Sequence, residues 1–185
     1  MLAIRQARVD EFDQVMDFYT KMIDGMRDTD FDVCWEHGVH PSPGFLRASV
    51  EAGEVYVGLV DEGEGASERE SRIASAMVLN GEGSDGYERV PWRVEAGPGE
   101  VLVVHVLGTL PVYHGRGYAR AMVEACIDIA QTAGKKAVRL DTFPFNVRAR
   151  RLYESCGFED CGTYQLAYDN VDEGGADFVM YERAL

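Results

Sequence analysis

Two glycines in a short loop are the first residues of this chain whose types and spacing suggest chemistry. Gly115 and Gly117 lie between an apolar, β-branched run at 101–107, which Pro111 should end, and a helical pattern that follows. Glycine lets a backbone turn sharply and approach a ligand closely. The free N–H groups of a helix N-terminus attract anions, most often phosphate. We therefore predict an anion site here, with an ordinary strand-to-helix connection as the alternative.

A second stretch, from Asn146 to Phe158, reads Asn-Val-Arg-Ala-Arg-Arg-Leu-Tyr-Glu-Ser-Cys-Gly-Phe. Together the two stretches resemble the GNAT N-acyltransferase superfamily. That family carries [Gln/Arg]-x-x-Gly-x-[Gly/Ala] in the loop and Asn-x-x-Ala-x-x-x-Tyr-x-x-x-Gly-Phe in the later helix. The later pattern is matched at every named position. The loop pattern is matched at Gly117 and Ala119, with His114 where Gln or Arg is usual.

This resemblance implies a binding site for acetyl-CoA as co-substrate. Backbone N–H groups at 114–120 would hold its pyrophosphate, helped by the helix dipole, and the strand backbone at 107–109 would pair with the pantetheine arm. Asn146 would both cap its helix and contact the pantetheine, and the small Ala149 would leave room for it. The expected cofactor-binding residues are Leu107, Gly108, Thr109, His114, Gly115, Arg116, Gly117, Tyr118, Ala119, Arg120, Asn146 and Ala149.

Acetyl transfer to an amine also needs an acid and a base. By resemblance, the Tyr153 hydroxyl protonates the departing thiolate, which suits a phenol with a pKa of about 10; a packed core aromatic is the alternative. The base stays open among three residues. Glu100 lies near the start of the central strand, where some relatives carry a Glu. His105 has a suitable pKa but is also typical of a hydrogen-bonded core residue, and Asp141 is the third candidate.

These residues predict an N-acetyltransferase that moves an acetyl group from acetyl-CoA to a primary amine by direct attack in a ternary complex. No cysteine lies in a recognisable nucleophile context, which disfavours a covalent intermediate. The acceptor is expected to be a small-molecule or peptide amine, and the acidic composition favours a polyamine-like or amino-sugar-like molecule. A non-catalytic acyl-CoA-binding sensor or interaction module is the alternative, and a different nucleotide binder is a third. Many relatives dimerise, so a homodimer is possible.

The net charge of −14 argues against nucleic acid and anionic membranes as partners. Positive charge is concentrated between Tyr113 and Arg151, where eight Lys and Arg accompany three acidic residues. The chain has no run of 18 apolar residues and no apolar leader, so we expect a cytoplasmic protein. Cys34-x-x-His37-x-x-His40 lacks a fourth ligand at zinc spacing, so no metal is expected.

The length of 185 residues suits one domain, 1–185. Apolar periodicity and turn residues predict strands at 2–7, 54–60, 73–79, 101–110, 135–142, 161–168 and 177–183. A helix is predicted after Asp10, which can cap it, and further helices at 43–52 after Ser42, at 117–133 and after Asn146. The stretch 61–72 should be a hairpin loop, and a turn is expected around Gly174-Gly175.

The predicted fold class is α/β, with the order β-α-α-β-β-β-α-β-α-β-β. This is the element order of the GNAT fold, which implies a mixed, strongly twisted central sheet flanked by helices. The resemblance also implies that the central strand splays from the next one, and that 28–42 lines the acceptor side; an ordinary loop with buried aromatics is the alternative for 28–42. The stretch 81–100 is longer than a usual connection and is interpreted as an ordered flap or an insertion.

Overall fold

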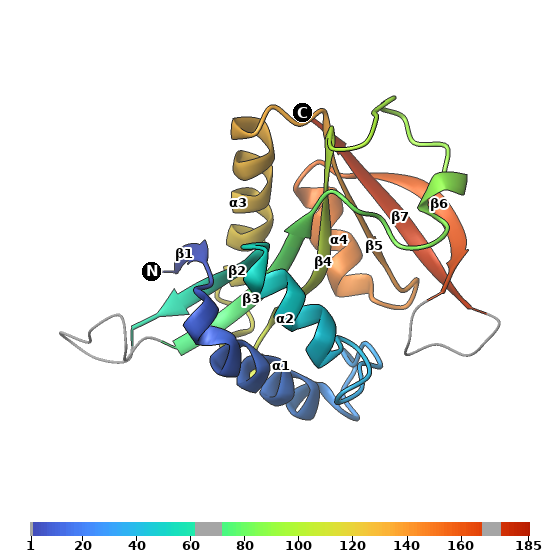
Figure 1. The fold of residues 1–185 in the computed structure, drawn as a ribbon. Helices are drawn as coiled ribbons and strands as arrows, with labels where there is room; N and C mark the ends of the chain where they lie inside the picture. The colour runs from blue at the N-terminus through green and yellow to red at the C-terminus, as the bar shows by residue number, and fades with distance from the viewer. Residues whose placement is uncertain (1, 62–71, 168–174) are drawn as a thin grey trace.

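A seven-stranded sheet forms the centre of the computed structural model, which describes residues 2–61, 72–167 and 175–185 (Figure 1). The strands lie in the order β1-β2-β3-β4-β5-β7-β6. They are β1 (Ala3–Gln6), β2 (Val55–Val60), β3 (Arg72–Asn80), β4 (Val101–Thr109), β5 (Ala137–Thr142), β6 (Glu159–Leu166) and β7 (Ala176–Ala184). The helices are α1 (Phe12–Met26), α2 (Pro43–Glu51), α3 (Tyr118–Thr132) and α4 (Val147–Ser155), with short 3-10 turns at Val9–Glu11, Tyr87–Arg89 and Pro111–Tyr113. The predicted order of strands and α-helices is confirmed.

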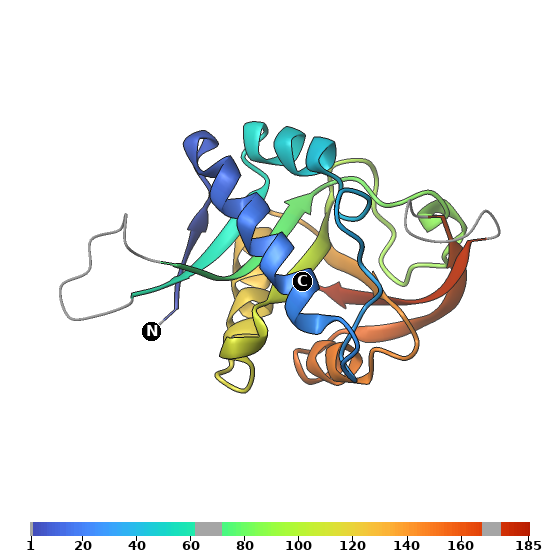
Figure 2. The same cartoon turned by 90° about the horizontal axis from the view of Figure 1, so that it is seen from below.

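Helices cover both faces of the sheet. Helices α1 and α2 pack on β2 and β3 through a core that includes Phe18, Leu46 and Val57. Helices α3 and α4 pack on the other face, around Met122 and Leu140. Figure 2 shows α1 and α2 side by side on one side of the sheet, with α3 behind it. This two-sided cover explains why β4 is almost continuously apolar.

The helix starts follow local capping chemistry, with one correction. Ser42 caps α2, because its Oγ accepts a hydrogen bond from the Phe45 N–H at 3.2 Å. The prediction that Asp10 caps α1 is wrong. A 3-10 turn precedes α1, Asp10 pairs with Arg8, and Glu11 is the residue that precedes the helix. The strand β6 also begins earlier than predicted, at Glu159.

Strands β4 and β5 run parallel for three residue pairs and then diverge. Their register joins Val101–Val103 to 137–139, although both strands continue beyond these pairs. A bulge in β4 accompanies the divergence: the register with β3 shifts there, and Val106 has φ 45°. The splay that the family resemblance implied is therefore present, and it opens a gap in the middle of the sheet.

The stretch 81–100 packs against the sheet as an ordered segment. Tyr87 and Val90 lie in a core with Val101 and Phe178. A buried ion pair between Arg139 and Glu182, 3.0 Å apart, anchors the segment further, because the same carboxylate accepts the N–H groups of residues 93 and 94. We call this stretch the 81–100 segment. Its first residues lie beside Asn80 at the end of β3 and His105 in the middle of β4.

Three predictions fall partly or wholly outside the described residues. Of the hairpin loop predicted at 61–72, only the two end residues are described. Tyr168, the last residue of the strand predicted at 161–168, and Gly174, the first residue of the predicted turn, also lie outside the described residues.

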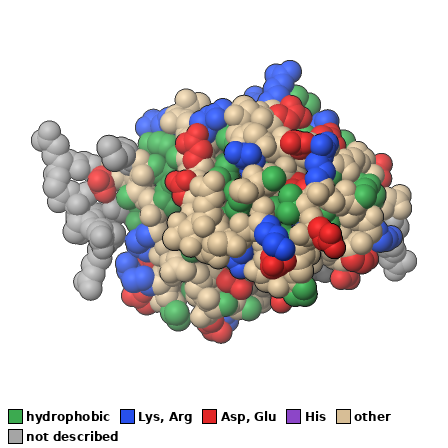
Figure 3. All heavy atoms as spheres, turned by 90° about the horizontal axis from the view of Figure 1, so that it is seen from above, with side chains coloured by type: hydrophobic (Ala, Val, Ile, Leu, Met, Phe, Trp, Pro, Cys, Tyr) green, Lys and Arg blue, Asp and Glu red, His purple; other side chains and the backbone are tan. Residues whose placement is uncertain are grey.

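On the face shown in Figure 3, acidic and basic side chains are interspersed with apolar ones. No helix among the described residues is long and apolar enough to span a bilayer.

Candidate active site

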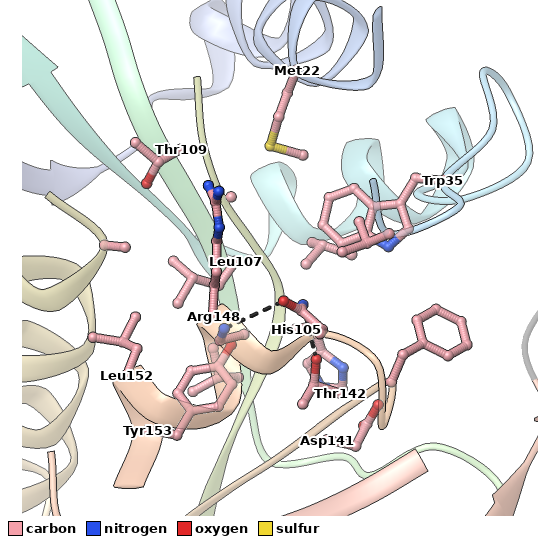
Figure 4. A pocket seen from close by; sticks show the side chains of 18 of the residues that line it. Met22, Trp35, His105, Leu107, Thr109, Asp141, Thr142, Arg148, Leu152 and Tyr153 are labelled. Atoms are coloured by element: carbon pink, nitrogen blue, oxygen red, sulfur yellow. Dashed lines mark hydrogen bonds between the residues drawn. The ribbon is translucent and has the colours of Figure 1, made fainter. Parts of the chain in front are cut away.

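A cavity of about 780 Å³ opens where β4 and β5 diverge. Its walls come from the ends of α1, β4 and β5, the loop and first turn of α3, one face of α4, the 28–42 stretch with the start of α2, and the start of the 81–100 segment. Figure 4 shows side chains from these elements converging on it, including Trp35, His105, Asp141 and Tyr153. The sheet gap and the two predicted motifs therefore form one site.

The N-terminus of α3 forms one end of this cavity. Gly117 is the N-cap residue with φ 79°, Gly115 has φ 77°, and no side chain in the described part of the chain caps the helix. A Cβ at either glycine would meet no atom within 4 Å, so the left-handed backbone and not lack of space requires glycine. The first N–H groups of α3 therefore lack a side-chain partner and are directed at a ligand-sized space, as an anion site needs.

Side chains of the same loop have structural roles. The His114 ring nitrogen Nε2 lies 3.0 Å from the carbonyl oxygen of Thr109, to which it can donate. The Arg120 guanidinium donates to Ser155 Oγ at 2.7 Å, which ties α3 to α4. Arg116 stacks over the Tyr113 ring and does not line the cavity. Every other predicted cofactor-binding residue does line it.

The end of β4 presents a backbone edge to the gap. Beyond Val103 the described residues show no strand paired with β4 on the β5 side, so this edge is free to pair with an extended, amide-containing ligand. Ser75 Oγ donates to the Gly108 carbonyl at 2.6 Å and holds the strand end against β3. A Cβ at Gly108 would collide with the Met22 side chain, so glycine is required for this packing.

Helix α4 presents one face to the cavity from its first turn. The Asn146 Oδ1 accepts the Ala149 N–H at 3.3 Å, and its Nδ2 donates to Thr142 Oγ1 at 3.1 Å. The predicted capping role of Asn146 is thereby confirmed. Ala149, Leu152 and Tyr153 follow on the cavity-lining face of this helix (Figure 4).

Tyr153 has a buried ring whose hydroxyl opens on the cavity. The residue is 7% exposed and packs against Phe158 and Tyr181. Among the described residues its hydroxyl has no hydrogen-bond partner, whereas the hydroxyls of the buried Tyr19 and Tyr87 are both bonded. Burial, with the Asp141 charge as a smaller cause, raises the pKa of Tyr153 well above its usual value. The phenol is therefore protonated and available as a donor.

His105 lines the cavity from β4 in a defined tautomer. Its Nε2 lies 3.0 Å from both Asn80 Oδ1 and the Glu82 carbonyl oxygen, which accept hydrogen bonds, so Nε2 carries the proton. Burial lowers the pKa of the imidazole, although the contact with Glu82 opposes this. The neutral ring keeps an unprotonated Nδ1, and this is the nitrogen that can accept a proton.

Asp141 stands beside His105 on the neighbouring strand. The β4–β5 register, continued two residues past its last pair, sets these two residues side by side across the gap (Figure 4). The Tyr87 hydroxyl donates to Asp141 Oδ2 at 2.6 Å. A carboxylate and an imidazole thus face the cavity together.

The structure does not bring Glu100 into this site. Glu100 precedes β4 at the end of the strand far from the cavity, pairs with Lys136 at 2.8 Å, and does not line the cavity. The Lys136 hydrogen bond and that of the Gly97 N–H lower the pKa of this carboxyl. Glu100 was a candidate base because it lies near the start of β4, but the cavity lies towards the other end of this strand.

The 28–42 stretch lines the cavity with aromatic side chains. Phe31, Trp35 and His40 all contribute to the wall, as the family resemblance implied for this stretch. His37 instead pairs with Asp24 at 2.7 Å. The described residues contain no group of three His, Cys, Asp or Glu side chains placed to hold a metal ion.

Sequence reasoning missed several residues that line the cavity. Asn80 lines it from the end of β3, Glu82 and Asp85 line it from the loop that follows, and Phe45 and Phe143 also contribute to the wall. These residues belong to no motif, and their position depends on how the 81–100 segment packs. The length and aromatic content of the 81–100 stretch indicated an ordered segment, but they did not indicate that this segment lines the cavity.

Comparisons with known proteins agree with this geometry. A model of the acetyltransferase (GNAT) family matches residues 20–158. The mycothiol acetyltransferase of Beutenbergia cavernae is 39% identical over 64 residues, which are 35% of this chain and 20% of that protein. The chain thus matches about a fifth of the length of this curated relative.

Solved structures share the whole fold. A GNAT-family acetyltransferase from Streptococcus agalactiae superposes with a TM-score of 0.76 at 19% identity, covering 100% of this chain and 95% of that one. Arabidopsis thaliana NAA60 in complex with acetyl-CoA superposes with a TM-score of 0.71 at 13% identity, covering 100% and 99%. Because the family model spans the chain from α1 through α4, the chain belongs to the GNAT acetyltransferase family.

Proposed function

We propose that this protein is an acetyl-CoA-dependent N-acetyltransferase that acetylates a primary amine by direct attack. One observation carries the proposal: the N-terminus of α3 and the Tyr153 hydroxyl, neither of which has a side-chain partner among the described residues, open on the same cavity. An anion site and a proton donor at opposite sides of a gap in the sheet suit a thioester co-substrate. The relative NAA60 was crystallised with acetyl-CoA on the same fold.

The residues that would hold acetyl-CoA follow from the cavity. The α3 N-terminus, with Gly115 and Gly117, would bind the pyrophosphate, and the free edge of β4 at 107–109 would pair with the pantetheine amides. Acetyl-CoA supplies an acyl group activated as a thioester. The chain supplies orientation, because the groups that line the gap are fixed by hydrogen bonds at Asn146 and Ser75.

Two proton movements accompany the transfer. The amine nitrogen forms a bond to the carbonyl carbon, the carbon–sulfur bond breaks, and the products are an amide and free CoA. His105 Nδ1 would accept the proton that the amine gives up, and the Tyr153 hydroxyl would donate one to the leaving sulfur. No cysteine occurs among the described residues that line the cavity, which supports direct attack.

Calorimetric titration with acetyl-CoA, followed by a free-thiol release assay over a panel of amines, tests the proposal. We expect micromolar binding and amine-dependent thiol release. Binding without release on any amine would favour the acyl-CoA-binding sensor. Absence of binding would contradict the proposal at its first step. Competition by ATP for the same site would favour a different nucleotide ligand.

A further inference from the structure

The acceptor end of the cavity carries carboxylates that lack a cationic partner. Glu82 and Asp85, from the start of the 81–100 segment, line the cavity together with Asp141. Among the described residues, the side chains of Glu82 and Asp85 have no ion-pair or hydrogen-bond partner, since Glu82 is bonded through its backbone. Both residues are exposed. Their negative charge is therefore available to a ligand that enters here.

The stretch that carries these carboxylates contacts the groups that would handle the reacting amine. The Glu82 carbonyl oxygen is 3.0 Å from His105 Nε2. Further along the same stretch, the Tyr87 hydroxyl donates a hydrogen bond of 2.6 Å to Asp141 Oδ2. The chain from 82 to 87 thus spans from His105 to Asp141. Glu82 and Asp85 lie on this stretch and line the same cavity as His105 and Asp141.

The arginines of the cavity are already paired and come from the helices. Arg120 on α3 donates to Ser155, and Arg148 on α4 pairs with Asp30 at 2.9 Å. These are the Lys and Arg residues among the described lining. A carboxylate entering the acceptor end would therefore meet repulsion, whereas a second ammonium group would meet attraction.

Two further observations indicate that a ligand completes this end of the cavity. Trp35, Phe45 and Phe143 line the cavity, and Figure 4 shows the Trp35 ring on its wall. Aromatic faces attract cations. Tyr153 is 7% exposed, opens on the same cavity, and lacks a hydrogen-bond partner among the described residues. The hydroxyl of a residue as buried as this one normally has a partner, which the bound reactants would provide.

We infer that the acceptor is a short diamine or polyamine, with a second cationic group besides the reacting amine and without a carboxylate. This inference rests on the proposed function and narrows it. The reacting amine lies between His105 and Asp141, and Glu82 and Asp85 bind the distal ammonium. The atoms transferred are those of the acetylation already described.

A panel of amines matched in length tests the inference. Its members are 1,5-diaminopentane, pentylamine, 5-aminopentanol and 5-aminopentanoate, with 1,3-diaminopropane and 1,4-diaminobutane to vary the spacing of the charges. We expect kcat/KM for the best diamine to exceed that for pentylamine at least tenfold, with 5-aminopentanoate the poorest substrate. The preference should shrink as salt is added, because the carboxylates are exposed.

The variant Glu82→Gln/Asp85→Asn removes both charges and keeps the backbone contact to His105. We expect the ratio of kcat/KM for diamine to that for pentylamine to fall about tenfold. The acetyl-CoA dissociation constant should stay within about twofold. Glu95→Gln, an exposed acidic residue of the same segment that does not line the cavity, is the matched control and should leave the ratio unchanged.

Equal rates for diamine and pentylamine, a preference for 5-aminopentanoate, or an unchanged ratio in the double variant would each overturn the inference while leaving acetyl transfer intact. If no amine of the panel is turned over, calorimetry can measure the binding of the diamine and of pentylamine to the CoA-loaded protein, and this binding then tests the inference. Charge-dependent binding lost in the double variant supports the inference, and its absence overturns it. Failure to bind acetyl-CoA at all would instead contradict the proposed function.

Discussion

The hydroxyl of Tyr19 in α1 donates a buried hydrogen bond of 3.0 Å to the carbonyl oxygen of Val106 in β4. Val106 is the β-branched residue with φ 45°, a left-handed conformation that is costly for valine. The hydrogen bond satisfies the carbonyl that the bulge turns out of the β3 ladder. Tyr19 thereby stabilises the distortion that accompanies the splay of β4 from β5.

Replacement Tyr19→Phe should destabilise the protein by about 1–3 kcal/mol, because a buried carbonyl loses its partner. The free energy of unfolding in urea measures this. Acetyl-CoA should also bind more weakly, because the bulge is no longer held. Tyr56→Phe, which removes an exposed hydrogen bond to Gln6, should change stability by less than about 0.5 kcal/mol. Equal effects of the two variants would contradict the role of Tyr19.

The two glycines that flank α3 allow the effect of backbone strain to be distinguished from an effect on ligand binding. Gly117 at the start of the helix and Gly134 after its end have φ 79° and 65°, and a Cβ at either would meet no atom within 4 Å. Gly117→Ala and Gly134→Ala should therefore cost a similar free energy of unfolding, about 1–2 kcal/mol. The dissociation constant of acetyl-CoA should rise tenfold or more in Gly117→Ala and stay constant in Gly134→Ala. A similar loss of affinity in both variants would show that strain alone is responsible.

Removal of the Tyr153 hydroxyl tests its assignment as the proton donor. Tyr153→Phe keeps the ring packed and should lower kcat about 100-fold or more, because it removes a general acid. Acetyl-CoA affinity should change little, since the hydroxyl is expected to act on the leaving sulfur. Tyr164→Phe, on a ring outside the cavity, is the control. An unchanged kcat in Tyr153→Phe would remove Tyr153 from the mechanism.

Much of this site could be predicted from local sequence. Gly117 and Asn146 mark helix starts through backbone conformation and capping, which depend on a few neighbouring residues, and both predictions are confirmed. The bulge could not be predicted, because valine disfavours a left-handed backbone and the partner that stabilises it, Tyr19, lies 87 residues away along the chain.

The prediction of Glu100 as a candidate base is wrong for a geometric reason. The sequence places Glu100 and His105 close together along one strand but does not say which end of the strand faces the ligand. At about 3.3 Å per residue, they lie more than 15 Å apart. The pairing of β3 with β4 brings Asn80 to His105. The packing of the 81–100 segment, held by pairs distant in sequence, brings Glu82 to His105 and Tyr87 to Asp141.

The buried pair of Arg139 and Glu182 should contribute strongly to stability. Their side chains are 10% and 2% exposed. Arg139→Met leaves the carboxylate buried without its cation, so we expect a loss of about 3–5 kcal/mol in the free energy of unfolding. Arg93→Met breaks an exposed ion pair with Glu159 and should cost no more than about 1 kcal/mol. Equal losses in the free energy of unfolding of the two variants would show that burial does not make the Arg139–Glu182 pair more important for stability than the exposed pair.

The lowered pKa of His105 predicts a specific pH dependence of both rate and stability. The ring is neutral at pH 7 and becomes protonated only below its usual range near 6.5, because burial disfavours the cation. The rate should therefore fall on the acidic side below pH 6.5. In the unfolded chain the imidazole binds a proton at about pH 6.5, before the folded protein does, so the free energy of unfolding should also fall as pH drops through this window.

His105→Gln separates these effects from those of other groups, because its amide N–H can replace Nε2 as donor to Asn80 and Glu82. The variant should lose most of kcat at pH 7, about 100-fold, and its remaining rate should lack the acidic limb. Its stability should also vary less between pH 5 and 7 than that of the wild type. If the variant keeps both the rate and the acidic limb, another group accepts the amine proton, and Asp141 is then the residue to replace.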